Sequence, residues 1–357
     1  MGPDVRGPMQ SAYLGPPAEG KARHRYAVAV ILFFLISFVV GAALTPWLYG
    51  LIVQVANWIG VTADPFPRYI PRVIPIVALL ILRPLAIWAG FKSPADVGLV
   101  APRGQSRKFL FGFSAAMLAL AMVCAIELNV GALTLRASIT LKAVLDALAV
   151  ALASALAVAL VEEILYRGMV LSLLARVCNW PTALLLSSLI FTLMHFLHRP
   201  VHEGPIAWYS GLALLPAMLA GWLDPHNLGA YAANLFLAGT LIGIAYGLTG
   251  NLYFSMGLHA GAVVCSKLSL AFTVFTPGAA TWFWGSGNLV DSWFTAGALL
   301  VAAVMFGVNS VRGGRPAAAG PDPVAAGARF GRSIEAVFVA YLAMLAVALL
   351  VSFAVMR

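Results

Sequence analysis

Residues 149–168 read AVALASALAVALVEEILYRG, and this stretch decides how the rest of the chain is interpreted. Its apolar first part carries no charge, whereas its last part brings two carboxylates and a guanidinium, Glu162, Glu163 and Arg167. A charged side chain at the centre of a membrane costs about 2.5–3.5 kcal/mol on insertion scales, so such residues tend to face the protein interior and to mark function. The stretch therefore predicts a membrane span with a polar site at one point along it.

The composition of the whole chain also indicates a membrane protein. Of its 357 residues, 62% are hydrophobic and 10% are charged, and the mean hydropathy is +0.93. A soluble domain has about 25% charged residues. Apolar windows of about 20 residues predict an all-α, polytopic transmembrane helical bundle of about nine spans. The windows lie near 27–48, 73–91, 108–128, 143–165, 181–200, 229–249, 251–272, 291–309 and 334–356.

The distribution of basic residues predicts the orientation of these spans. With the N-terminus inside, 14 of the 22 Lys and Arg residues fall on inside segments, six fall on outside segments, and Arg83 and Lys267 fall within spans. By the positive-inside rule, we expect a cytoplasmic N-terminus and an outside C-terminus, in the inner (plasma) membrane of a bacterium. This topology, together with attraction to the lipid bilayer, explains the basic excess without a nucleic-acid partner.

The chain is expected to divide into four parts. Residues 1–26 are read as a disordered basic cytoplasmic tail and 27–139 as N-terminal transmembrane helices. Residues 140–272 form a core that contains the charged stretch. Residues 273–357 add C-terminal transmembrane helices with an Arg-rich cytoplasmic loop at 310–333.

One segment, 202–228, does not fit a simple span. It is broken by three prolines and is too short for two crossings. We expect it to be re-entrant or interfacial on the outer side, with Trp208, Tyr209 and Trp222 at headgroup depth.

The charged stretch has a spacing that separates its two carboxylates. Glu163 and Arg167 stand four residues apart, acid before base, and can pair on one helical face. Glu162 points about 100° away from Glu163 on a helix of 3.6 residues per turn and is left without a partner there. Two carboxylates in different environments are the usual basis for separate acid and base roles. An interhelical salt-bridge cluster without chemistry is the alternative.

Two histidines on other spans can join this set. Phe191 and His195 share a helical face in an apolar span, and His259 lies in a third span. A lone His on such a face is usually a satisfied core residue. If Glu162, His195 and His259 instead meet at one depth, they would surround a water molecule. Such a set of side chains can activate the water and stabilise an oxyanion.

At these residues the sequence resembles the CPBP family of intramembrane proteases, also called Abi or type II CAAX prenyl proteases. Its motifs are EExxxR, FxxxH, and HxxxN or HxxxD. Residues 162–167 and 191–195 match the first two. The third matches only at His259, because Val263 stands where the family has Asn or Asp. Ser255 and Ser266 are possible substitutes on the same helical face.

The resemblance implies a CPBP/Abi-like catalytic core at 140–272 that hydrolyses peptide bonds within the membrane. It implies that Glu162 and His195 polarise the attacking water, that His259 holds the oxyanion, and that Glu163, Arg167 and Phe191 support the site. No metal is favoured, since HExxH is absent. The alternatives are Zn²⁺ held by Glu162, His195 and His259, or by His195, His198 and His202.

The expected substrate is a membrane protein or a lipidated or anchored peptide, cut in a membrane-embedded or membrane-proximal segment, C-terminal segments included. Two other functions stay open. Val263 favours a non-catalytic scaffold or bacteriocin-immunity protein with the same fold. A proton-coupled transporter could use the same Glu and His residues as a relay.

Overall fold

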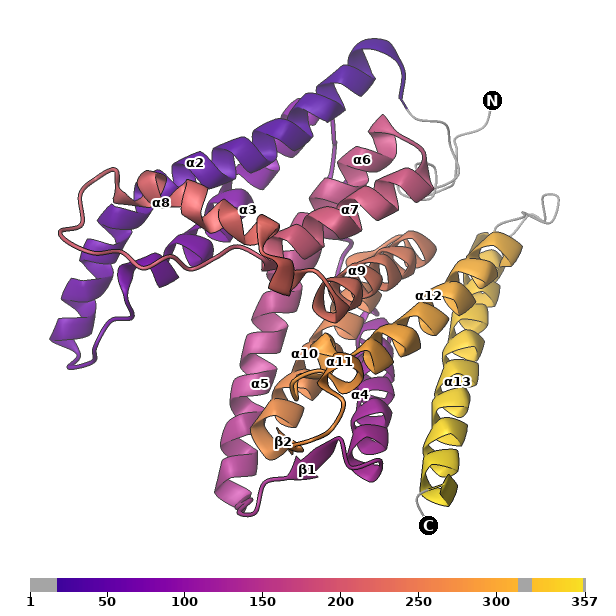
Figure 1. Cartoon of the computed structure of the whole chain (residues 1–357). Coiled ribbons are helices and arrows are strands. Elements are labelled where there is room, and N and C mark those ends of the chain that lie inside the picture. The colour runs from indigo at the N-terminus through magenta and orange to yellow at the C-terminus, as the bar shows by residue number, and fades with distance from the viewer. Residues whose placement is uncertain (1–17, 314–322, 356–357) are drawn as a thin grey trace.

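The computed structural model describes residues 18–313 and 323–355, and almost all of its regular structure is helical (Figure 1). The long helices are α2 (Gly20–Trp58), α3 (Ile70–Ala89), α4 (Ser106–Asn129), α5 (Leu141–Glu162), α7 (Trp180–His195), α9 (Ala230–Thr249), α10 (Leu252–Phe272), α12 (Trp293–Gly313) and α13 (Pro323–Val355). Short elements join them: η1 (Phe66–Arg68), η2 (Pro94–Val97), β1 (Leu133–Leu135), η3 (Glu163–Leu171), α6 (Ser172–Val177), α8 (Ser210–Leu219), η4 (Ala220–Leu223), η5 (Pro225–Asn227), β2 (Thr273–Phe275), α11 (Thr281–Trp284) and η6 (Leu289–Asp291).

The helical transmembrane fold predicted from the sequence is confirmed, but the count of nine spans is not. Among the described residues, seven helical segments are long and apolar enough to cross a membrane. The expected windows 181–200 and 291–309 correspond to shorter apolar helices, Trp180–His195 and Trp293–Asn309. The first of these helices ends at His195, and residues 196–200 are not helical.

Two segments that we expected to be irregular are partly helical. Residues 1–17 of the expected tail lie outside the described residues, but α2 already begins at Gly20. Its Lys, Ala and Arg residues are good helix formers, and Arg23 Nε donates to the carbonyl oxygen of Val177. Within the expected loop 310–333, α12 runs on to Gly313 and α13 starts at Pro323, while 314–322 lies outside the described residues. Proline is favoured at the first position of a helix.

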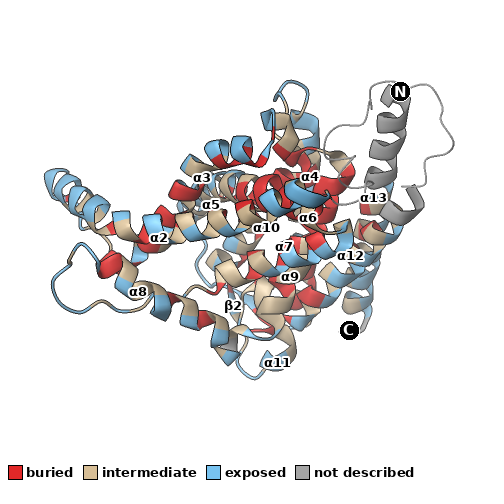
Figure 2. Ribbon diagram, turned by 90° about the horizontal axis from the view of Figure 1, so that it is seen from above, coloured by how far each residue is buried: buried red, intermediate tan, exposed pale blue. Residues whose placement is uncertain are grey.

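The helices form three groups side by side (Figure 1). Helices α2, α3 and α8 make an arm that leads away from the centre, and α12 and α13 stand on the opposite side. Between them lie α4, α5, α7, α9 and α10. Figure 2 shows the buried residues gathered in this central group, whereas the far end of α2 is mostly exposed.

Glycines let α10 pack closely against α4. A Cβ atom built at Gly257 or Gly261 of α10 would lie 2.1 and 2.2 Å from the carbonyl oxygens of Phe109 and Phe113 in α4. Small residues of this kind allow close backbone contact between membrane helices. Because His259 stands between the two glycines, this contact fixes the rotation and the depth of that histidine.

Small residues also set the packing of α5 and of α9. The α5 side chains Ala151, Ala155 and Ala159 are buried against Ala260 and Val264 of α10. In α9, a Cβ atom at Gly239 would meet Ser188 and Phe191 of α7 at 3.3 Å. Small residues thus allow close packing of α5 on α10 and of α9 on α7.

The segment 202–228 packs against α2 and α7. It contains α8, which lies against α2 so closely that a Cβ atom at Gly211 would be 2.0 Å from the Ala42 carbonyl oxygen. Trp208 and Tyr209 are exposed, whereas the Trp222 indole Nε1 donates to the Leu193 carbonyl oxygen of α7 at 2.8 Å. An antiparallel pair, β1 with β2, was not expected; it joins the ends of α4 and α10.

Candidate active site

The charged stretch lies inside one continuous helical segment, Leu141–Val177, which runs on past the end of the expected window 143–165. Within it, Glu163–Leu171 forms a π-helix, so that the backbone hydrogen bonds span five residues instead of four. π-helical turns are rare and occur frequently at functional sites. The Arg167 carbonyl in this turn also accepts the Ser172 hydroxyl at 3.2 Å. The side chains of the motif therefore stand on a widened turn that the hydrophobic pattern does not reveal.

Glu163 and Arg167 form the buried base of the site. Arg167 Nη1 donates to Glu163 Oε1 at 2.8 Å, and the two side chains are 2% and 0% exposed. Arg167 Nη2 donates to the Gly239 carbonyl oxygen of α9, and its guanidinium stands 4.6 Å from the ring centre of Phe191. His259 Nδ1 contacts the same Glu163 oxygen at 2.8 Å. The Glu163–Arg167 pair thus connects η3 with α9 and α10.

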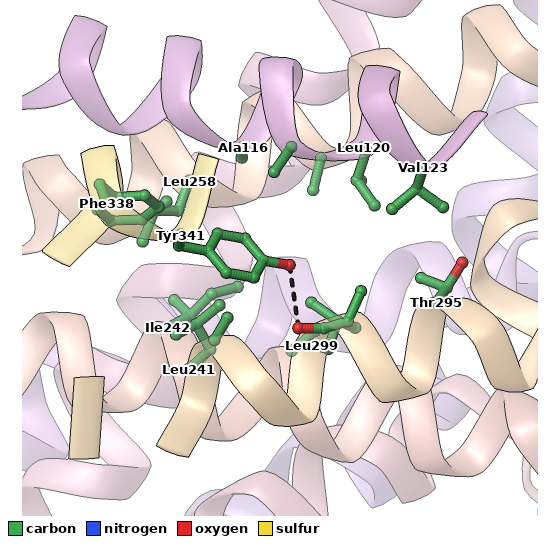
Figure 3. A pocket seen from close by; sticks show the side chains of 15 residues that line it. Ala116, Leu120, Val123, Leu241, Ile242, Leu258, Thr295, Leu299, Phe338 and Tyr341 are labelled. Atoms are coloured by element: carbon green, nitrogen blue, oxygen red, sulfur yellow. Dashed lines mark hydrogen bonds between the residues drawn. The ribbon is translucent and has the colours of Figure 1, made fainter. Parts of the chain in front are cut away.

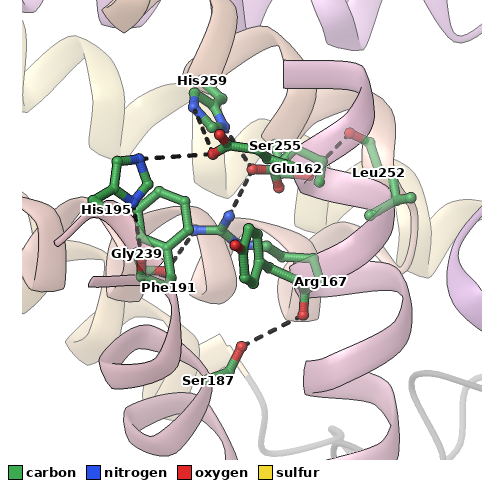
Figure 4. Close-up of polar contacts among 11 residues, drawn as sticks. Glu162, Arg167, Ser187, Phe191, His195, Gly239, Leu252, Ser255 and His259 are labelled. Carbon is green, nitrogen blue, oxygen red and sulfur yellow. Dashed lines mark hydrogen bonds and ion pairs between the residues drawn. The ribbon is translucent and has the colours of Figure 1, made fainter. Parts of the chain in front are cut away.

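Glu162 faces the two histidines (Figure 4). Its Oε2 atom lies 3.9 Å from His195 Nε2 and 3.8 Å from His259 Nε2. The Glu162 and His195 side chains are 25% and 26% exposed, whereas His259 is 8% exposed. Oε2 itself is buried and has no hydrogen-bond partner among the described residues. The three residues expected to be catalytic therefore meet around one buried point, beside which the Glu162 and His195 side chains are partly exposed.

The neighbours of the two imidazole rings fix where their protons lie. His195 Nδ1 is 2.8 Å from the Phe191 carbonyl oxygen, which can only accept, so Nδ1 carries the proton. His259 Nδ1 is 2.8 Å from a carboxylate oxygen that already accepts from Arg167, so the same assignment holds. These protons are inferred from the hydrogen bonds. The Nε2 atom of each ring then lies on the side of Glu162 Oε2.

The candidate substitutes for the missing third-motif residue do not reach this point. Val263 is partly buried against the alanine stripe of α5. Ser255 is buried, but its hydroxyl donates to the Leu252 carbonyl of its own helix at 2.9 Å. Among the described residues, neither Ser255 nor Ser266 has a hydrogen bond to Glu162, His195 or His259.

The histidines after His195 diverge from it. His198 Nε2 lies 3.4 Å from Asp224 Oδ2, and the His202 ring packs 5.4 Å from the ring of Phe66. Over the described part of the chain, no group of three or more His, Cys, Asp or Glu residues is arranged to hold a metal ion. His195, His198 and His202 therefore do not converge as one set of ligands.

A separate apolar cavity of about 60 Å³ lies on the other side of α10 (Figure 3). It is lined by α4, α9, α10, α12 and α13, and the Tyr341 hydroxyl there donates to the Ala298 carbonyl oxygen. Leu258, next to His259, faces it. The cavity contains none of the three residues around Glu162, so it belongs to the packing of the C-terminal helices.

Sequence reasoning missed the contribution of α9. The Gly239 carbonyl holds Arg167, and Gly239 also lets α9 approach α7. A GxxxGxxxG pattern at Gly239, Gly243 and Gly247 was the available signal, because such patterns mark close helix contacts in membranes.

Comparison with known families agrees with this geometry. Residues 144–265 match the family model described as type II CAAX prenyl endopeptidase Rce1-like. The resemblance to the CPBP family is confirmed over this segment, which contains all three motif positions. Over these residues the chain is similar to a family of type II CAAX prenyl endopeptidases. Searches of curated proteins and of solved structures found no match.

Proposed function

We propose that this protein is an intramembrane endopeptidase in which Glu162 activates a water molecule for attack on a peptide bond. The observation that carries the proposal is that the Nε2 atoms of His195 and His259 both lie close to Oε2 of Glu162, at 3.9 and 3.8 Å. These distances are too long for direct hydrogen bonds. A water molecule beside the three atoms can donate to two of them and keep a lone pair for the substrate. Catalytic hydrogen bonds are often long before substrate binds.

The reaction then needs one proton transfer at each stage. Glu162, with His195, takes a proton from the water as its oxygen bonds to the scissile carbonyl carbon. His259, protonated at Nε2 and supported by the Glu163 carboxylate at 2.8 Å, donates to the developing oxyanion. When the C–N bond breaks, Glu162 gives its proton to the leaving nitrogen. Arg167 holds the Glu163 carboxylate in place throughout, because it donates to the same oxygen.

The proposed substrate is a membrane-embedded or membrane-proximal segment of a membrane or lipid-anchored protein. The description of the matched family, a prenyl endopeptidase of CAAX type, supports a C-terminal segment. We propose the inner membrane of a bacterium as the location and no metal as cofactor.

Three matched variants in the native host test this function. The wild-type protein should create a set of protein termini in the membrane and secreted proteomes by cleavage. These termini should be missing in Glu162→Gln and in His195→Ala. Cleavage should fall by about 10²–10⁴-fold, the usual contribution of a general base. Glu203→Gln is the control, because Glu203 is exposed. If all variants give wild-type termini while a phenotype persists, the non-catalytic scaffold is correct and the protease is not.

A further inference from the structure

The end of α7, which carries His195, is held from outside the motif helices. Three contacts reach residues 193–198 from residues 218–222. The Trp222 indole Nε1 donates to the Leu193 carbonyl oxygen at 2.8 Å, and the Met218 carbonyl accepts the His198 amide at 2.9 Å. A Cβ atom at Gly221 would lie 1.9 Å from the Phe196 carbonyl oxygen, so the two backbones touch.

The first contact acts on the turn that bears the histidine. The last four carbonyls of a helix have no partner within the helix. Leu193 is two residues before His195, and its carbonyl accepts both the Phe196 amide at 3.0 Å and the Trp222 indole. The indole therefore ties the final turn of α7 to the η4 turn. Any rotation of this turn would move His195 Nε2 relative to Glu162.

The same indole also packs against the supporting aromatic residues. Trp222 contacts the buried cluster formed by Phe191, Phe196 and Leu235. Phe191 in turn lies 4.5 Å from the His195 ring and accepts its Nδ1 proton. One side chain of the segment 202–228 thus meets both the backbone and the aromatic support of His195.

We infer that residues 210–227 act as a brace that sets the position of His195, with Trp222 as the positioning residue. Besides its contacts with α7, this segment packs on α2 through Gly211. Within the segment, the Asn227 side-chain amide donates to the Gly221 carbonyl oxygen. The His198–Asp224 pair lies at its edge. The inference rests on the proposed function, since it assigns a role in that reaction.

The test is Trp222→Phe, which keeps an aromatic ring and removes the N–H donor. Trp208→Phe makes the same change at a side chain that is 65% exposed and is the matched control. We expect kcat for peptide cleavage to fall roughly 10- to 100-fold in Trp222→Phe, because small misplacements of a catalytic group have effects of this size. KM and the melting temperature should not change. Trp208→Phe should behave as wild type.

Hydrogen exchange provides a second measurement that does not depend on catalysis. The amides of Phe196 and His198 should exchange faster in Trp222→Phe, while those of α10 should not. An unchanged kcat with unchanged exchange at residues 196–198 would overturn the brace, as would a rise in KM alone. If the wild-type protein cleaves nothing, the proposed function fails, and the exchange result alone decides whether Trp222 holds the end of α7.

Discussion

Arg167 shows how a single side chain can hold three helices together. Its guanidinium pairs with Glu163 on its own segment, donates to Gly239 of α9 and stacks on Phe191 of α7. Arginine suits this position because its planar group combines several donors with a flat face. Lysine has a compact charge on a flexible stem and cannot make all three contacts.

Replacement of Arg167 should therefore reveal the cost of an unpaired buried charge. Arg167→Met leaves Glu163 buried without its guanidinium, and we expect the free energy of unfolding to fall by about 3–5 kcal/mol. The double variant Glu163→Gln with Arg167→Met removes both charges and should recover much of this loss. Unfolding in detergent, followed by a double-mutant cycle, measures the coupling. Additive losses would mean that the ion pair is not the source of the stability.

The pairing of Glu163 with Arg167 could be predicted from the sequence, because both residues lie on one helix at a fixed spacing. The contact between Glu163 and His259 joins residues 96 positions apart and could not be predicted in the same way. The resemblance to the family motifs pointed to the positions of Glu162, His195 and His259. It gave no indication that Glu163, instead of a third-motif Asn or Asp, would hold the His259 ring.

At the scale of elements, the contact between α4 and α10 places His259. A Cβ atom at Gly257 would lie 2.1 Å from the Phe109 carbonyl oxygen, a backbone atom that cannot turn aside. Gly257→Ala should push α10 away from α4 and lower the free energy of unfolding by about 1–3 kcal/mol, as overpacking does. It should also lower cleavage activity, because His259 moves with α10.

Gly297→Ala in α12 is the control for this change. No atom lies within 4 Å of a Cβ built there, and Ala favours a helix over Gly by up to about 1 kcal/mol. Thermal unfolding of both variants beside the wild type measures the difference. Equal melting temperatures for Gly257→Ala and Gly297→Ala would contradict the close packing of α10 on α4.

The elements also show which features a hydrophobic pattern can and cannot predict. Apolar windows located the helices, because burial in lipid requires long apolar runs and leaves their positions clear in the sequence. The π-helix at Glu163–Leu171 could not be predicted, since a single change of hydrogen-bond register leaves the apolar pattern almost unaltered. The early end of α7 at His195 depends on contacts from Trp222 and Met218, which lie far along the chain.

At the scale of the whole molecule, an odd or even number of membrane crossings decides whether the two termini lie on opposite sides or on the same side of the membrane. Seven described segments are long and apolar enough to cross, and two further expected spans are the shorter α7 and α12. If both of these cross, or if neither does, the number of crossings is odd and the termini lie on opposite sides. Only one crossing of the two would put both termini on the same side. The turn between Val177 and Trp180 is short, so α7 returns in the direction opposite to α6.

Thiol labelling of intact cells tests this topology together with the orientation expected from the basic residues. Ser138 and Ala101 are both exposed, in the loops after α4 and before it. With the N-terminus inside, a membrane-impermeant thiol reagent should label Ser138→Cys and should label Ala101→Cys only after the membrane is opened. The wild-type protein is the blank, because Cys124, Cys178 and Cys265 are partly or fully buried. A reporter fused to the C-terminus should read as outside. Labelling of Ala101→Cys in intact cells would show that the orientation is the opposite of the expected one. A C-terminal reporter inside, with Ser138→Cys labelled from outside, would mean that only one of α7 and α12 crosses.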